Sequence, residues 1–418
     1  EHWLQSGFEN ILLMKYVEKH YKDEKLIGSL SDIWGLRSYN LAKLKFNDQY
    51  HLTYLHMIRT GRDQALNTPK DQLLKFNANL SSKYKAAKGL LYLENRIQGS
   101  TIEEWIKEFI FNPNQPHKTT EDFKTYLKTK TSKDIDWFFD SFLTNTKQVD
   151  YKITSIENTK DSIYFTVKNT KSGQRPVSLF MLKDGEIISK QWLSGIKNEK
   201  KFVVANNQAD HLVLNYDQKV PEFDLRNNWK SANGKSLLTK PLQVRLFKDF
   251  ESPHDHQLYF LPIVEFQNIY DGVDLGLNFN NKGILSKPFI FGITPTFSTR
   301  SRALTGSVQL QYTNFFEDQN LYNIKYGVSV SRSSFAKNAF VTKTVPYLSF
   351  NFRNAYDLRS NAFKKLNIRY VGIEKDFTTS ETSESTRPPY QIFNIRYLNS
   401  YNGFKKYKKV EGGVSVES

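Results

Sequence analysis

The first part of the chain places its apolar residues at the spacing of an α-helix. They recur at helical intervals over residues 8–17, and a second such pattern covers residues 84–98. Gly99 follows the second pattern, and Gly is common just past a helix end. Thr101 then precedes a third apolar pattern with acidic residues in its first turn, which suits the positive end of a helix dipole. We therefore expect residues 1–148 to form an α-helical domain.

Residues 149–218 change to an alternation of apolar and polar positions with period two, which is typical of half-buried strands. Several short candidate strands follow one another, and Asp184-Gly185 between two of them is a strong hairpin turn. Short strands at this spacing predict a small β-sandwich of the Ig-like type. A polar linker, residues 219–239, then leads to the rest of the chain.

From residue 240 to the end, the candidate strands become longer. One face of each is apolar, often ending in aromatic residues, and the other holds mainly Ser, Gln, Asn, Gly and Arg, as in the lumen of a barrel. Segments of roughly 10 residues match tilted strands that cross a bilayer. The long polar turn at residues 378–389, among shorter turns elsewhere, fits the same architecture. The alternation is clearest in residues 273–279, 307–312, 326–331, 348–353, 366–370 and 393–397.

These patterns predict a multidomain α + β protein. Its third domain, residues 240–418, would be an antiparallel outer-membrane-type β-barrel, truncated at the C-terminal end of the chain. A soluble β-sheet domain is the alternative for the same residues, because a period-two signal is weak in each single segment.

Composition narrows the class of protein further. Mean hydropathy is −0.57 and no apolar run approaches the roughly 20 residues of a membrane-spanning helix, so none is expected. The aromatic content of 14% suits a β-rich protein or a membrane barrel with aromatic girdles. The chain has no Cys, which excludes disulfides and thiolate metal sites. It opens without an initiator Met, and we expect it to be a segment of a longer protein.

The net charge of +16 raises the question of a nucleic-acid partner. The Lys and Arg residues are spread along the whole chain, however, and form no single basic helix or arm. This distribution favours a solvated basic surface, or contact with the phosphates of an anionic lipid leaflet, over nucleic acid.

Catalytic signatures are sparse. No pair among the eight His residues has the His-Glu-x-x-His spacing that places two imidazoles on one helix face. His51 and His56 are five positions apart, which is poor for a shared ligand face, and His254 and His256 flank an Asp in what reads as an exposed polar turn. The chain also lacks a Gly-x-Ser-x-Gly elbow and a Gly-rich phosphate loop.

One motif adds a resemblance. Residues 3–8, Trp-Leu-Gln-Ser-Gly-Phe, resemble the Trp-Leu-x-Glu-Gly-Phe motif of the aminopeptidase N-like gluzincin zinc metallopeptidases, whose Glu is the third zinc ligand. Tyr84 resembles the Tyr of that family's Tyr-x-x-Gly helix start, whose hydroxyl donates to the oxyanion, with Ala87 in place of the Gly. The segment around Trp137 resembles the family's closing helical pair. The resemblance implies a thermolysin-like peptidase lobe for residues 1–148, and the later domains resemble those of barrel-fused members in Gram-negative bacteria.

The departures from the family bear on activity. Ser6 stands where the zinc-binding Glu belongs, and a hydroxyl is a poorer zinc ligand than a carboxylate. Glu9, one turn further along, is a weak candidate for that role. The family's His-Glu-x-x-His helix is absent from this chain. Tyr84 is therefore the catalytic residue that can keep its role, and zinc, the cofactor of the intact family, is not expected to bind this segment.

Two functions follow from the resemblance. The first is a membrane-anchored aminopeptidase-like protein that acts on peptides at the cell outer membrane, with its lobe periplasmic or surface-exposed. The alternative is a pseudoenzyme, a catalytically dead binding or assembly module whose partners are outer-membrane lipid and other outer-membrane proteins. The substitution at Ser6 favours the alternative. A soluble polysaccharide- or nucleic-acid-binding protein is a third and more distant possibility.

Overall fold

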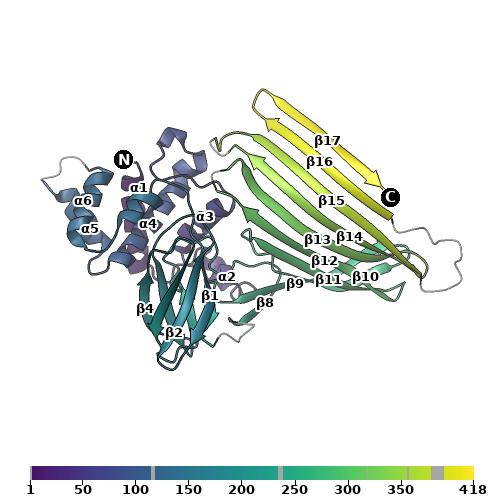
Figure 1. Cartoon of the computed structure of the whole chain (residues 1–418), viewed down its shortest axis with the longest axis horizontal. Coiled ribbons are helices and arrows are strands. Elements are labelled where there is room, and N and C mark those ends of the chain that lie inside the picture. Colours follow the sequence, from purple (N-terminus) through teal and green to yellow (C-terminus); the bar gives the residue numbers. More distant parts are fainter. Residues whose placement is uncertain (1, 114–117, 234–238, 318, 355–356, 378–389) are drawn as a thin grey trace. The chain divides into compact units, whose positions relative to one another are not determined.

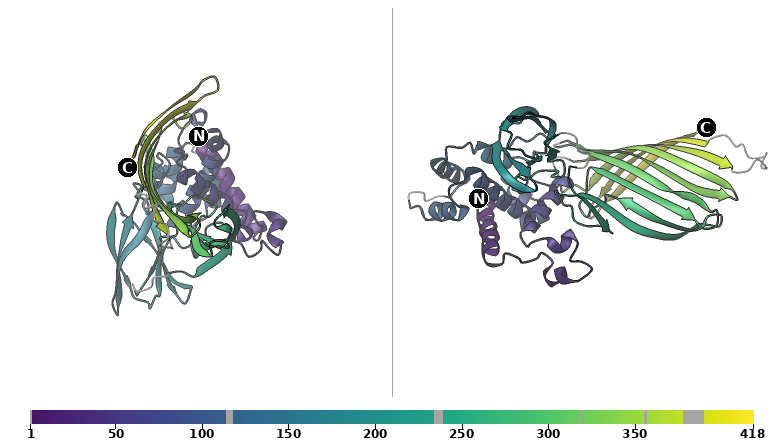
Figure 2. Two further views of the ribbon diagram at one scale, coloured as in Figure 1. Left: turned by 90° about the vertical axis from the view of Figure 1, so that its right-hand side faces the viewer. Right: turned by 90° about the horizontal axis from the view of Figure 1, so that it is seen from below.

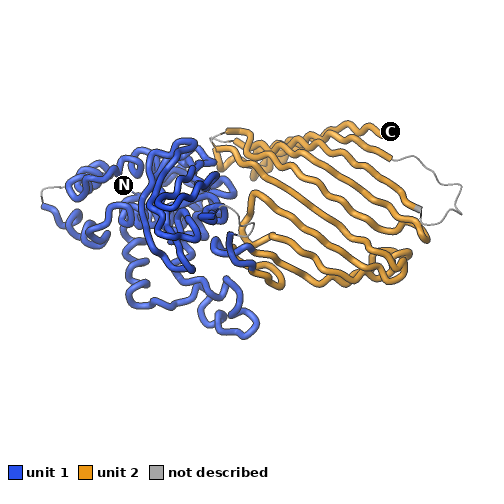
Figure 3. Tube along the Cα trace, turned by 60° about the horizontal axis from the view of Figure 1, so that its bottom comes forward, with its two compact units in different colours: residues 1–242, 252–256 blue, residues 243–251, 257–418 orange. Residues whose placement is uncertain are grey.

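The computed structural model describes residues 2–113, 118–233, 239–317, 319–354, 357–377 and 390–418 (Figure 1). The chain forms two compact units (Figure 3). The first unit comprises residues 1–242 and 252–256, and the second comprises residues 243–251 and 257–418. The long polar turn expected at residues 378–389 lies outside the described residues.

The helices of the first unit are short, apart from two that form its centre. They are α1 (His2–His20), α2 (Asn40–Lys43), α3 (Asp48–Arg59), α4 (Ser82–Ile97), α5 (Ile102–Phe111) and α6 (Thr120–Lys130), with single turns of other helix types at Gly28–Asp32, Lys70–Gln72, Asn77–Ser81 and Phe138–Phe142.

The starts of α5 and α6 are set by capping boxes. The Thr101 hydroxyl accepts a hydrogen bond from the Glu104 amide, and the Glu104 side chain accepts one from the Thr101 amide. Thr119 and Asp122 repeat the arrangement at α6. Each box satisfies two amides that the first helical turn leaves without a partner, which confirms the predicted helix start at Thr101.

Helices α1 and α4 pack closely against each other at Gly7. A Cβ at this position would lie 3.2 Å from the Ala86 Cβ and 3.2 Å from the Leu90 Cδ1. Helix α1 continues without interruption through Gly7. The glycine thus allows two helices to approach, which is a common use of a residue without a Cβ.

Two small antiparallel sheets complete the first unit. The strands are β1 (Tyr151–Asn158), β2 (Ser162–Asn169), β3 (Val177–Lys183), β4 (Glu186–Leu193), β5 (Glu199–Ala205), β6 (His211–Leu214) and β7 (Trp229–Ser231). One sheet has the order β1-β2-β5 and the other β4-β3-β6-β7. A single cluster of buried apolar residues runs from Trp3 in α1 to Ala232 after β7, so the helices and both sheets share one core.

The second unit is built on one ten-stranded sheet in the order β17 to β8. Every pair of its strands with a described register is antiparallel, and Figure 2 shows that the sheet is strongly curved. The strands are β8 (Leu242–Leu246), β9 (His256–Asn268), β10 (Gly272–Asn280), β11 (Phe289–Ser298), β12 (Ala303–Phe315), β13 (Leu321–Ala336), β14 (Ala339–Arg353), β15 (Ala362–Phe377), β16 (Tyr390–Asn402) and β17 (Tyr407–Glu417).

The predicted fold class is wrong. We expected a thermolysin-like α-helical peptidase lobe, a small Ig-like β-sandwich and an outer-membrane-type β-barrel. The chain is mostly β, with 17 strands and six α-helices in the described residues. No separate helical peptidase lobe is evident there, because the helices share their core with the small sheets. The large sheet does not close into a barrel, since its order begins at β17 and ends at β8 in the part of the chain that is described.

Gly89 offers a test of the packing around α4. A Cβ at this position would lie 2.3 Å from the Phe142 Cε1, and Phe142 is fully buried. We expect Gly89→Ala to destabilise the protein by about 1–3 kcal/mol, the usual cost of overpacking a core. Urea unfolding followed by circular dichroism measures the effect. Gly35→Ala is the matched control, because nothing lies within 4 Å of its Cβ position. Equal midpoints for the two variants would contradict the prediction.

Candidate functional site

Ser6, at the predicted metal-ligand position, lies on the buried face of α1. It is 3% exposed, and its hydroxyl donates a hydrogen bond of 2.7 Å to the carbonyl oxygen of His2 in the same helix. Such a bond to a carbonyl one turn earlier is a common way for a serine inside a helix to satisfy its hydroxyl. The Ser6 side chain is thus engaged by its own helix.

The other predicted site residues, Glu9 and Tyr84, contact residues other than Ser6. Glu9 is exposed and accepts a hydrogen bond of 2.9 Å from Gln5 on the same face of α1. Tyr84 lies in the first turns of α4, and its hydroxyl donates to Gln49 Oε1 at 2.9 Å. The Tyr84 ring packs on Tyr50 with centroids 4.2 Å apart, and burial raises its pKa. The structure therefore does not bring Glu9 and Ser6 to one point.

The histidines that the structure describes do not form a metal cluster. In the described ranges, no group of three or more His, Asp or Glu residues is placed to hold a metal ion. His254, which we expected in an exposed turn, is instead half-buried with its ring centroid 4.8 Å from that of Tyr216 and 5.9 Å from that of Trp229. His51 lies on α3, where burial and then the charges of Lys88 and Arg59 lower its pKa well below the ordinary value.

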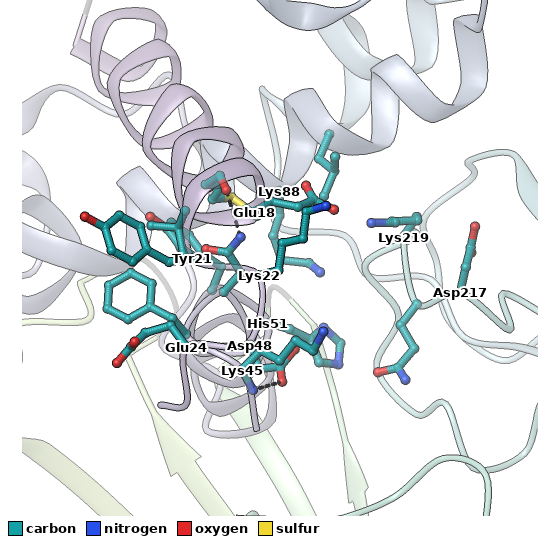
Figure 4. Close-up of a pocket in the computed structure, with 17 residues that line it drawn as sticks. Glu18, Tyr21, Lys22, Glu24, Lys45, Asp48, His51, Lys88, Asp217 and Lys219 are labelled. Carbon is teal, nitrogen blue, oxygen red and sulfur yellow. Dashed lines mark hydrogen bonds between the residues drawn. The ribbon is translucent and has the colours of Figure 1, made fainter. Parts of the chain in front are cut away.

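A pocket of about 510 Å³ opens in the first unit between α1, α3, α4 and the segment after β6 (Figure 4). Its apolar wall includes Met14 and Val17 of α1 and Leu91 of α4. Lys88 and Lys219 reach into the same space from two elements, with His51 of α3 nearby. We call this space the Lys88 pocket.

Lys88 is the unusual member of this pocket. The residue is 6% exposed, and its side-chain ammonium makes no hydrogen bond or ion pair with any residue in the described part of the chain. Burial, and then the positive charge of Lys219, lower the pKa of Lys88 to about 7, although Asp48 and Asp217 act to raise it. A buried amine with such a pKa inside a cleft is typical of functional sites.

Lys85, one turn earlier on α4, shows how the fold treats a buried lysine with a structural role. Its Nζ donates to Asp63 Oδ2 at 2.6 Å and to the carbonyl oxygen of Gln64 at 3.0 Å. Burial lowers the pKa of Lys85, but the carboxylate of Asp63 opposes this change. The two lysines thus differ in that Lys85 has a counter-ion at contact distance, whereas Lys88 faces a cavity.

The large sheet presents a second candidate surface. In its registers, Tyr312, Tyr326, Leu348, Ile368, Ile395 and Val414 pair in succession from β12 to β17. A parallel row joins Phe279, Ile293, Val308 and Val330. Because neighbours in register lie on the same side of a sheet, these rows form one continuous apolar face. Many of its side chains are exposed, and Val414 is 66% exposed.

The opposite face of the same sheet is polar. The Ser298 hydroxyl, fully buried, donates to Asp274 and lies 2.7 Å from the Thr305 hydroxyl. Further along, the Tyr347 hydroxyl donates to Gln311 Oε1 at 2.7 Å. The side chains of the polar face thus hydrogen-bond to one another, as buried polar groups require. Many side chains of the apolar face, in contrast, are exposed among the described residues.

None of the described helices is both long and apolar enough to cross a membrane.

Lys88 is not among the residues predicted from the sequence. A signal was present, because Lys85 and Lys88 stand among Ala86, Ala87 and Leu90, the residues of α4 that face the core. A charged residue at a core position of an amphipathic helix needs a partner or a cavity. The Lys88 pocket itself combines segments far apart along the chain, and only folding brings them together.

The charge of Lys88 should make stability depend on pH. Its pKa is about 7 in the folded chain, against an ordinary value of 10.5, so unfolding takes up a proton between these values. The free energy of unfolding should therefore rise with pH across this window, by at most about 1.4 kcal/mol per pH unit from this group. Lys88→Met should remove that contribution, so its stability gain over the wild type is largest below pH 7 and shrinks towards pH 10.

Urea unfolding of the two proteins at pH 6.5 and 9.5 measures this difference. Lys83→Met, on the same helix but outside the Lys88 pocket, is the control. A stability difference between Lys88→Met and wild type that is the same at both pH values would contradict the assignment.

Comparison with known proteins adds little to this geometry. No family model and no curated protein matches the chain. Among solved structures, the crystal structure of Legionella pneumophila aminopeptidase A in complex with aspartic acid is similar to 42% of this chain, with 18% sequence identity and a TM-score of 0.32. The similar part is 22% of that chain. This chain therefore has a weak structural likeness to an aminopeptidase, and a TM-score of this size supports no conclusion about fold or activity.

Proposed function

We propose that the chain is a peptidase-like binding module of a protein at the cell outer membrane. In this role the first unit holds peptides or partner proteins and does not hydrolyse them. The observation that carries the proposal is Ser6. It occupies the position of the family's zinc-binding Glu, and its hydroxyl is both buried and bonded to the carbonyl oxygen of His2.

The residues present do not fit a zinc site of the family type. A neutral hydroxyl is a weak ligand beside a carboxylate, and this hydroxyl would first have to leave the helix carbonyl. Glu9 does not replace it, because its carboxylate is exposed and bonded to Gln5. Ser6 thus serves the packing of α1.

A metallopeptidase acting on peptides is the second candidate. It is favoured by Trp3 and Phe8, which keep the family motif and are buried on α1 on either side of Gly7. In that case Tyr84 would be the residue that acts on the substrate, with its hydroxyl released from Gln49 to donate to an oxyanion.

The proposed location rests on the apolar face of the large sheet. Exposed Val, Ile, Leu, Phe and Tyr side chains form continuous rows on this face and are not scattered singly. A large continuous apolar patch of this kind marks a surface that contacts another protein or a membrane. We propose that lipid covers it, because the opposite face is hydrogen-bonded within the sheet and the chain carries a charge of +16, which favours an anionic leaflet.

The first test concerns metal and hydrolysis. We expect the purified full-length protein to contain less than stoichiometric zinc and to leave aminoacyl-arylamides intact, because the third ligand is a bonded hydroxyl. Zinc is measured by atomic absorption and turnover by release of the arylamine. Stoichiometric zinc, with turnover that is lost in Tyr84→Phe and kept in the neighbouring control Tyr50→Phe, would establish the second candidate instead.

The second test concerns the sheet. Leu310 points to the apolar face and is 39% exposed, whereas its neighbour Gln311 lies on the polar face. We expect Leu310→Arg to reduce the fraction of protein that floats with lipid vesicles, since an arginine on a lipid-facing position costs up to about 2–4 kcal/mol. Gln311→Arg, which adds the same charge, should leave that fraction unchanged. Equal flotation of both variants in high salt would show that lipid does not contact the apolar face.

A further inference from the structure

The charged residues that line the Lys88 pocket differ in their burial and in their ion pairs. The pocket is lined on its basic side by Lys22, Lys45, Lys88 and Lys219, together with the half-buried His51. Lys45 lies 3.8 Å from the exposed carboxylate of Asp23. Lys88 is the basic residue among them that is more than nine-tenths buried.

Two of the four acidic residues of the pocket have other partners, and the other two are exposed. The four are Glu18, Glu24, Asp48 and Asp217. Asp217 pairs with Lys190, which lies outside the pocket, at 2.8 Å, and Asp48 Oδ2 accepts a hydrogen bond of 2.7 Å from the Lys45 amide. Glu18 and Glu24 are exposed. Asp48 and Asp217 thus act on the Lys88 ammonium electrostatically and raise its pKa, but they do not form an ion pair with it.

The geometry leaves the Lys88 ammonium facing a cavity and without a counter-ion in the described part of the chain. Burying an unpaired charge is costly, and an anion that enters the cavity would offset that cost through a charge-assisted hydrogen bond. The fold keeps Lys88 at this position although Lys85, on the same helix, shows that a carboxylate partner can be supplied internally.

We propose that the Lys88 pocket binds a small organic carboxylate, whose anionic group pairs with the Lys88 ammonium. Lys219, on the facing segment, would contact the same group, and Met14, Val17 and Leu91 would cover an apolar body attached to it. A volume of about 510 Å³ lies within the range of small-molecule sites.

The acidic residues favour a monoanion. Asp48 and Asp217 both act on Lys88 electrostatically, so a doubly charged phosphate would meet more repulsion than a carboxylate. The His51 imidazole is neutral near pH 7, because burial and the charge of Lys88 lower its pKa well below the ordinary value, and therefore it adds no second charge.

The proposal does not depend on the one for Ser6 and the sheet. Ser6, Glu9 and Tyr84 are not among the residues that line the Lys88 pocket. The pocket could be present in a zinc peptidase or in a binding module. The test of zinc content and hydrolysis and the test of carboxylate binding can therefore fail independently.

The experiment measures binding of N-acetyl-leucine to the full chain by isothermal titration at pH 6.5 and 9. We expect millimolar or tighter binding at pH 6.5, and weaker binding at pH 9 by up to about 100-fold, because Lys88 with a pKa of about 7 is then mostly neutral. N-acetyl-leucine amide, which has no charge, should bind at least tenfold more weakly at pH 6.5.

Variants and a competing anion complete the test. Lys88→Met should abolish binding, whereas Lys19→Met, exposed on α1 and outside the pocket, should not change it. Absence of binding to the wild type, equal binding of acid and amide, or an affinity that does not fall with pH would each overturn the proposal, even if Lys88→Met failed to fold. Tighter binding of inorganic phosphate than of N-acetyl-leucine would overturn the assignment to a carboxylate.

Discussion

Close packing of α1 against α4 is the constraint on which the first unit depends. The contact requires Gly7, because a Cβ there would press on Ala86 and Leu90, both fully buried. Helix α4 then carries the contact onward. The hydroxyl of Tyr92 donates to the carbonyl oxygen of Pro176, before β3, and its ring lies 4.3 Å from that of Trp137. One helix thereby joins α1, the aromatic residues near position 140 and a small sheet into a single core.

That central position explains why α4 also carries the unusual chemistry of the unit. A helix surrounded by other elements buries residues on several sides, so polar groups on it must be paired or open onto a cavity. Lys85 is paired with Asp63, and Lys88 opens onto a pocket. Ser6 on α1 is an example of a third solution, in which the hydroxyl bonds to its own helix. The central position of α4 therefore determines both the packing of this unit and the surroundings of its buried lysines.

Features that depend on a few consecutive residues could be predicted from the sequence. The capping box at Thr101 and the alternation around Val328 involve only neighbours along the chain, and the structure has a helix start and a strand there. Features that depend on distant segments could not. The close approach at Gly7 is set by Ala86 and Leu90 of another helix, and the closure of the large sheet depends on whether β8 meets β17. The motif located Ser6, but its burial and its bond to His2 required the fold.

The registers of the large sheet have a consequence for how this part of the chain can change in length. Side chains alternate between the two faces with period two, so inserting one residue near the start of a strand such as β13 would exchange the faces of the residues that follow in that strand. Tyr326 would then leave the apolar row that it shares with Tyr312 and Leu348. An insertion of two residues would restore the alternation. Relatives that keep this sheet should therefore differ in strand length by even numbers of residues, with odd changes confined to the turns or absorbed by bulges.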